Sequence, residues 1–176
     1  MILMFSTYDV LIESSIHNKA AKEFLTVGWG KKETQFHGSA GKDARKKDEV
    51  EIQDVDKFDK TITCCWRGDG EFFAVNFVGD NGRMFKVYDK EGVLQYVSES
   101  CANLQFPMAW KPSGLWIAKP ELHIKTNKYS VTLFERNGLK HNEIPLPFDF
   151  DTEQVVNLCW NQDSEIFLIE TIRGDI

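Results

Sequence analysis

The stretch "ITCCWRGDGEFFAV", residues 62–75, occurs in altered form twice more along the chain. Its counterparts are "FPMAWKPSGLWIAK", residues 106–119, and "VNLCWNQDSEIFLI", residues 156–169. In all three, a small residue precedes a tryptophan, and a polar turn and an apolar run follow it; the tryptophans are Trp66, Trp110 and Trp160. They lie 44 and then 50 residues apart (110 − 66 and 160 − 110), so the chain contains an internal repeat.

Each repeat has the composition of a β-hairpin. A strand ends at the tryptophan, the polar turn reverses the chain, and a second strand of aromatic and aliphatic residues follows. The turn ends in Asp-Gly, Ser-Gly or Asp-Ser, and glycine supplies the positive φ angle that such turns require. In the middle repeat, Pro112 fixes a φ angle of the turn in advance. We therefore expect three antiparallel hairpins.

A second pair of stretches extends the repeating unit. "FKVYDKEGVLQY", residues 85–96, aligns with "VTLFERNGLKHN", residues 131–142. In both, an alternating strand ends in an aromatic and an acidic residue, and a basic residue and a glycine turn follow. The Asn-Gly pair at Asn137 is favoured in tight hairpin turns. The full unit is thus four short strands in roughly 40–50 residues, which is typical of a β-propeller blade.

These patterns predict an all-β protein, a partial WD-type β-propeller of about three four-stranded blades. Residues 1–60 would hold an irregular first blade and a charged loop, residues 61–104 and 105–150 one blade each, and residues 151–176 the start of a further blade. Propellers close with about four to eight blades, so we expect an open arc that is a fragment of a longer protein. Open strand edges would leave it marginally stable or prone to aggregate.

Composition places the chain among ordinary globular proteins. It has 176 residues, of which 42% are hydrophobic and 27% charged, and its net charge of −6 argues weakly against a surface that wraps nucleic acid. The sequence shows neither a secretory signal nor an apolar stretch long enough to span a bilayer. We expect a cytoplasmic location, which a nuclear one can accompany.

The cysteines and histidines do not form a metal-binding pattern. There is no C-x-x-C spacing, and the histidines are scattered far from the cysteines, so we expect no metal and no cofactor. These residues are Cys64, Cys65, Cys101, Cys159, His17, His37, His123 and His141. A redox role for the Cys64-Cys65 pair is not favoured, because Cys65 and Cys159 take the repeat position that Ala109 fills, which requires only a small apolar side chain.

The polar segment "VGWGKKETQFHGS", residues 27–39, is the strongest candidate for chemistry. It matches neither a P-loop nor a dinucleotide-binding loop, because positions 25 and 33 lack the required glycines. His37 with Glu33 could form an acid–base pair, and His37 with Ser39 part of a triad, although no G-x-S-x-G elbow surrounds Ser39. A hydrogen-bonded structural loop is the favoured interpretation, and we predict no catalytic residue.

Two further features allow a nucleic-acid interpretation. The tryptophans could stack on bases, but their constant place before a turn favours packing between blades. A basic rim could form at residues 31–32 and 45–47, but acidic residues between positions 43 and 51 favour an ordinary solvated surface. We therefore favour structural roles for both.

Several of these stretches together resemble a known family. They are "VGWGKKETQFHGSAGK" (27–42), "WRGDGEFFAV" (66–75), "AWKPSG" (109–114), "FERNGL" (134–139) and "LPF" (146–148). In this order they resemble the N-terminal propeller region of the largest Elongator subunits, the IKAP family. The resemblance spans most of residues 24–169, and its first stretch is the most specific.

The resemblance implies a non-catalytic scaffold with two WD-type propellers, a helical repeat region and a C-terminal dimerisation part. The complex modifies the wobble uridine of certain tRNAs at carbon 5, and another subunit, with a radical SAM cluster and an acetyl-CoA site, carries the chemistry. The expected partners are other Elongator subunits, with only indirect tRNA association and no membrane. Homodimerisation would use a region beyond residue 176.

Two alternatives remain open at this point. The repeats fit a generic WD-type interaction module in another pathway equally well, and only residues 28–42 separate it from the Elongator interpretation. An enzyme that uses His37, Glu33 or Ser39 is the third and least favoured. The segment before Phe24 is shorter than in the family, which suggests that an upstream blade is absent.

Overall fold

The computed structural model describes residues 2–6, 9–14 and 60–173, and the strands among them form antiparallel sheets. The strands are β1 (Ile2–Ser6), β2 (Asp9–Ser14), β3 (Thr63–Trp66), β4 (Phe72–Gly79), β5 (Gly82–Asp89), β6 (Leu94–Val97), β7 (Ala109–Trp110), β8 (Ile117–His123), β9 (Lys128–Phe134), β10 (Lys140–Asp149), β11 (Glu153–Trp160) and β12 (Phe167–Arg173). A 3-10 turn at Ile124–Thr126 joins β8 to β9. In these residues no helix is long and apolar enough to cross a membrane.

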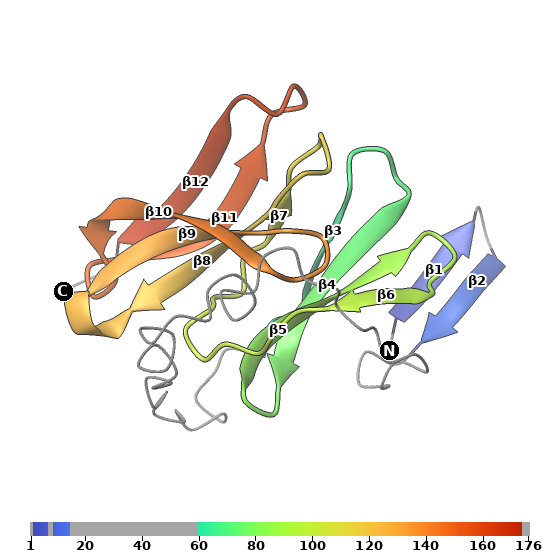
Figure 1. The fold of residues 1–176 in the computed structure, drawn as a ribbon, viewed down its shortest axis with the longest axis horizontal. Coiled ribbons are helices and arrows are strands. Elements are labelled where there is room, and N and C mark those ends of the chain that lie inside the picture. Colours follow the sequence, from blue (N-terminus) through green and yellow to red (C-terminus); the bar gives the residue numbers. More distant parts are fainter. Residues whose placement is uncertain (1, 7–8, 15–59, 174–176) are drawn as a thin grey trace, which may run out of the picture.

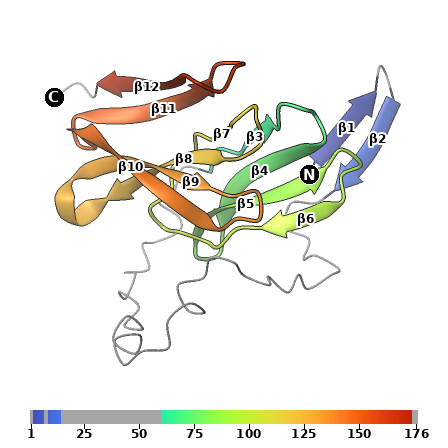
Figure 2. The ribbon, with the colours of Figure 1, turned by 45° about the horizontal axis from the view of Figure 1, so that its top comes forward.

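Two four-stranded sheets with the same strand order form the centre of the structure. The first sheet runs β3-β4-β5-β6 and the second β7-β8-β9-β10, each strand pairing with the next along the chain. Strands β11 and β12 form a separate two-stranded sheet, as do β1 and β2. Figure 1 shows the first, second and third sheets of residues 60–173 side by side, and Figure 2 shows β11 and β12 along one face of the second. The predicted partial β-propeller is confirmed.

The three tryptophan hairpins are also confirmed, and their turns share one geometry. The amide after each tryptophan donates to the carbonyl five residues on: Arg67 to Phe72 (2.9 Å), Lys111 to Trp116 (2.8 Å) and Asn161 to Ile166 (2.9 Å). The fourth residue after each tryptophan has a positive φ angle: Gly70 (73°), Gly114 (83°) and Ser164 (65°). Figure 1 shows the three turns on the same side of the molecule.

The hairpin at Asn137-Gly138 uses a longer turn than a two-residue Asn-Gly loop. Only Gly138 has a positive φ angle (87°), whereas a type I′ turn needs positive φ at both central residues. The Gly138 amide donates to the Glu135 carbonyl and the Glu135 amide to the Leu139 carbonyl, both at 2.9 Å. This is the three-residue loop in which a type I turn is followed by a left-handed glycine.

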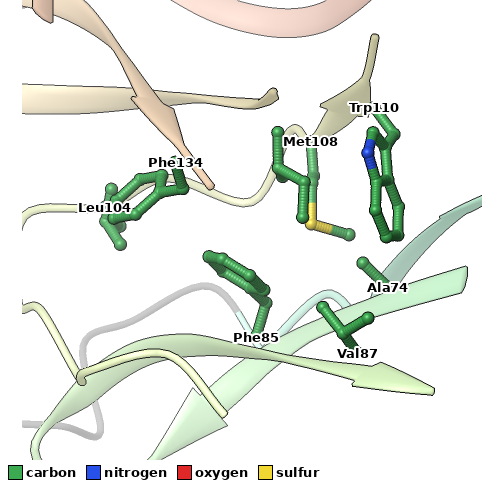
Figure 3. Close-up of a cluster of buried hydrophobic side chains, with 8 residues drawn as sticks. Ala74, Phe85, Val87, Leu104, Met108, Trp110 and Phe134 are labelled. Carbon is green, nitrogen blue, oxygen red and sulfur yellow. The ribbon is translucent and has the colours of Figure 1, made fainter. Parts of the chain in front are cut away.

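The main core lies between the first and second sheets. Ala74, Phe85 and Val87 come from β4 and β5, and Trp110, Ile117 and Phe134 come from the second sheet. Leu104 and Met108, from the segment that joins the sheets, complete it. Figure 3 shows the Phe85 and Val87 side chains facing those of Met108, Trp110 and Phe134. Contact between successive sheets thus buries the apolar side chains.

A second core lies between the second and third sheets. Ala118, Tyr129, Val131 and Leu133 pack there with Val155 and Leu158 of β11. Trp160 and Phe167 pack against its margin, with ring centroids 4.5 Å apart. The same mode of packing therefore occurs twice along the chain.

The predicted role of the tryptophans between blades holds for two of the three. Trp110 is buried in the main core and Trp160 packs on the second, but Trp66 is 50% exposed and packs on Phe73 of its own hairpin. Trp110 and Trp160 each pack against the sheet that precedes their own. The prediction is wrong for Trp66 within the described residues.

The small residue before each tryptophan lies on the opposite face of the hairpin. In the first two hairpins this face contacts the following sheet. Cys65 packs against the main core and Ala109 is buried, as predicted. Cys159 is exposed, so the prediction of a buried slot is wrong there. Among the described residues, no sheet follows β11 and β12.

Replacing Gly138 with alanine should weaken the contact between the first two sheets. A Cβ atom there would lie 2.6 Å from the Cα atom of Ser98, in addition to the strain of a positive φ angle. Gly70 is the matched control, because its φ is +73° but no atom lies within 4 Å of its Cβ position. Gly70→Ala should cost about 1 kcal/mol of unfolding free energy and Gly138→Ala at least ~2 kcal/mol. Equal losses in urea unfolding would contradict the close approach.

Candidate functional site

The segment with the sequence-predicted chemistry, residues 27–39, lies outside the described residues. Glu33, His37 and Ser39 therefore remain candidates from sequence only, and the charged loop predicted within residues 1–60 is likewise untested. The described part of the chain brings together two other polar groups of side chains. Both lie on the face of the second sheet that is directed toward the first.

Lys119 of β8 is the centre of the first group and is fully buried between the two sheets. Its Nζ donates to Asn76 Oδ1 on β4 (2.6 Å) and to the Gln105 carbonyl (3.2 Å). Asn76 Nδ2 in turn donates to the Phe106 carbonyl (2.7 Å) and to Thr63 Oγ1 (3.1 Å). The group thus ties β8 to both β3 and β4 through hydrogen bonds.

Burial governs the protonation of this group. Desolvation, and then the positive charge of Arg83, hold the pKa of Lys119 well below its usual range. Burial raises the pKa of the nearby Cys65 thiol to about 12, so this thiol stays protonated at neutral pH. The thiolate is the nucleophilic form of cysteine, so this environment suppresses the reactivity of Cys65. This buried environment is consistent with the packing role that the sequence predicts for Cys65.

The second group joins β8, β9 and β10 through charged side chains. Lys140 Nζ lies 2.9 Å from Glu121 Oε2 and 3.0 Å from Glu143 Oε2, and Thr132 Oγ1 donates to Glu121 Oε2 at 2.5 Å. Burial alone would lower the pKa of Lys140, but its hydrogen bonds to the two carboxylates raise it. Burial would raise the pKa of Glu143, but Lys140 holds it below its usual value. The charges therefore stabilise one another across three strands.

His123 and Ser130 belong to the same group but are not arranged as a catalytic triad. Ser130 Oγ lies 2.8 Å from His123 Nε2, and Glu143 Oε1 lies 2.6 Å from the same nitrogen. In a triad, the base holds the serine with one ring nitrogen and the carboxylate with the other. Here both groups lie at Nε2, so the three side chains bridge strands β8, β9 and β10 but do not form the serine–histidine–carboxylate relay of a triad.

Sequence reasoning missed Lys119, although a signal was present. It stands nine residues after Trp110 (119 − 110), where the other two repeats have Val75 and Ile169. A lysine at an otherwise apolar position of a repeat indicates a buried cation with a specific partner. The partner, Asn76, is 43 residues away, and no local pattern identifies it.

No set of metal ligands is found in the part of the chain that the structure describes. Groups of three or more histidine, cysteine, aspartate or glutamate side chains that could hold a metal ion do not occur there. The polar groups that do occur are engaged with one another across strands. The geometry of residues 60–173 therefore supports a structural arc whose polar side chains hold its strands and sheets together.

Comparison with known proteins identifies the family. The family model described as "ELP1 first N-terminal beta-propeller" matches residues 1–175. The chain belongs to this family. Its propeller assignment agrees with the two repeated sheets and the hairpin sheet that follows them. The sequence resemblance to the largest Elongator subunits is thereby confirmed.

Relatives from animals and fungi give the same result. The chain is 47% identical to Elongator complex protein 1 of Drosophila melanogaster, over 97% of this chain and 14% of that protein. It is 39% identical to the Mus musculus protein of that name (96% and 13%) and 34% identical to that of Schizosaccharomyces pombe (97% and 14%). The chain thus spans about one seventh of the length of these relatives.

Replacing Lys119 with methionine should change how stability depends on pH. Because burial lowers its pKa in the folded chain, the unfolded chain binds more protons between the folded pKa and about 10.4. The free energy of unfolding of the unaltered chain should therefore rise with pH in that window, by up to about 1.4 kcal/mol per pH unit. Lys119→Met removes this contribution. Urea unfolding of both chains from neutral pH to about pH 10 measures it, and parallel curves over that range would contradict a depressed pKa.

Proposed function

We propose that this chain acts as a non-catalytic scaffold segment of the Elongator complex, supporting carbon-5 modification of the tRNA wobble uridine through protein–protein contacts. The observation that carries the proposal is the family match over residues 1–175, with relatives that are named Elongator complex protein 1. The partners would be other Elongator subunits. Homodimerisation and tRNA association would depend on parts of the longer protein beyond this chain, and the site of action would be the cytoplasm, with the nucleus as an alternative.

The side-chain arrangement supports a role without chemistry of its own. Lys119 and His123, which would be the natural acid–base candidates in the second sheet, are held in hydrogen bonds that join strands. The Cys65 thiol stays protonated at neutral pH because of its raised pKa. Lys119 and His123 thus join strands of the arc, which is what a scaffold requires.

A generic WD-type interaction module is the second candidate, since any propeller offers surfaces for protein partners. The family match favours the Elongator assignment over it. The two differ in which proteins accompany the chain in cells, so co-purification separates them.

The test is to express the tagged 176-residue chain in Drosophila melanogaster cells and identify the proteins that co-purify with it. We expect Elongator subunits, and we expect an excess of the chain to lower the fraction of tRNA wobble uridines modified at carbon 5, because it competes with the endogenous subunit. Trp110→Asp is the control, since a carboxylate in the main core should abolish folding and binding together.

Two outcomes would count against the proposal. Recovery of other proteins without any Elongator subunit would favour the generic module. Equal recovery of Elongator subunits with the Trp110→Asp chain would show that the contact does not depend on the folded arc.

A further inference from the structure

The turns that follow the three tryptophans lie together on one rim of the arc (Figure 1). A Cβ atom on Gly68 of the first turn would overlap the backbone of the second, and the Ser113 amide of the second donates to Ser164 Oγ of the third (2.9 Å). The turn between β9 and β10 is on the same rim, because Ile117 at the start of β8 pairs with Phe134 at the end of β9. We call this side the turn rim; its turns span residues 67–71, 90–93, 111–116, 135–139 and 161–166.

Positively charged side chains lie on aromatic rings along the turn rim. Arg67 Cζ is 4.3 Å from the centroid of the Phe72 ring, and Arg136 Cζ is 5.7 Å from the same centroid. Lys111 Nζ is 5.0 Å from the centroid of the Trp160 ring. The electron-rich face of an aromatic ring attracts a cation, so these contacts hold the three charged groups in place.

The three cations form a continuous line across the sheets. Arg136, from the second sheet, and Arg67, from the first, share the Phe72 ring. Arg67 Cδ lies 3.0 Å from the position of a Cβ atom on Gly114, in the turn that also carries Lys111. Lys111 in turn reaches the third sheet. We call Arg136, Arg67 and Lys111 the cation line.

Two of the three cations have no acidic partner within the described part of the chain. Arg67 Nε donates to Asp69 Oδ1 (2.7 Å), but no carboxylate there pairs with Arg136 or Lys111. The Arg136 side chain is exposed and that of Lys111 is half-buried. The turn that carries Lys111 also exposes Leu115, which is 59% accessible. The line therefore offers two positive charges without a carboxylate and an apolar side chain beside one of them.

The chemistry of the line fits the carboxylates of a protein better than a nucleic acid. Single-stranded RNA binds by stacking its bases on open aromatic faces, but the Phe72 and Trp160 rings already carry cations. Acidic side chains of the same rim, Asp163 and Glu165, would repel a continuous phosphate backbone. A protein segment presents its carboxylates singly, and an arginine can bind each with two parallel hydrogen bonds.

We propose that the cation line binds an extended acidic segment of a partner protein, with carboxylates on Arg136 and Lys111 and an apolar side chain on Leu115. Charge complementarity selects the segment, because its carboxylates pair with cations that have none in the described part of the chain. The surface serves the scaffold function proposed above and rests on it only for its biological use. Its binding can be measured on the chain alone.

A short acidic peptide and the purified 176-residue chain test the proposal. The probe is a fluorescein-labelled peptide of sequence Ser-Glu-Glu-Leu-Glu-Glu-Ser, and the same peptide with glutamine at every glutamate is the charge control. Fluorescence anisotropy at low salt should show saturable binding of the acidic peptide and none of the glutamine peptide. Added salt should weaken the binding, because it screens exposed charges.

Two double variants with the same loss of charge locate the site. Arg136→Gln with Lys111→Gln should weaken peptide binding about fivefold or more. Lys90→Gln with Lys125→Gln is the matched control and should weaken it less than about twofold. Lys90 is already paired with Glu71, and Lys125 lies in the 3-10 turn between β8 and β9, at the other ends of these strands. Circular dichroism checks folding; if the first double variant unfolds, Arg136→Gln alone, at an exposed turn position, should still weaken binding.

Three results would overturn the proposal. The first is an acidic peptide that shows no saturable binding. The second is equal weakening by the two double variants, which would indicate attraction to overall charge. The third is tighter binding of an oligouridylate of the same length, lost in the Arg136 and Lys111 variant, which would assign the line to RNA. Failure to recover Elongator subunits from cells would count against the proposed function but not against this binding, so the two failures are distinguishable.

Discussion

The packing of the Trp110 and Trp160 hairpins against the sheet before each of them is the contact on which the rest of this fold depends. Trp110 is buried among side chains of both four-stranded sheets, and Trp160 repeats the arrangement between the second sheet and β11–β12. The two larger clusters of buried side chains each combine residues from two successive sheets. Stability must therefore come from stacking one sheet on the next, as in other repeat architectures.

Polar contacts give this apolar stacking a specific register. The hydrogen bonds of Lys119 with Asn76 join β8 to β4 at one relative position, and burial makes any other position costly because it would leave an amine or an amide unpaired. Close approach of Gly138 to Ser98 adds a steric constraint at the rim. Apolar area thus drives the association of the sheets, while a few polar and glycine contacts define its geometry.

The local structure could be predicted from the sequence, because turns and strand alternation depend on neighbouring residues. The positions of the tryptophan hairpins and their turns could be predicted from the repeated sequence pattern. This includes the third hairpin, where Ser164 takes the glycine position. Which tryptophan is buried could not be predicted, because Trp66 and Trp110 occupy the same position of the repeat and burial depends on contacts between sheets. The hydrogen bond from Lys119 to Asn76 could not be predicted for the same reason, since it joins residues on different sheets.

Comparing the loss of stability from Trp110→Ala with that from Trp66→Ala tests this account most directly. Both substitutions remove the same side chain from the same position of the repeat. If stacking between sheets holds the arc together, urea unfolding should show a loss of about 3–5 kcal/mol for Trp110→Ala, or no folded chain at all, and no more than ~1–2 kcal/mol for Trp66→Ala. Equal losses would mean that the tryptophans act within their own hairpins and that the sheets do not depend on one another.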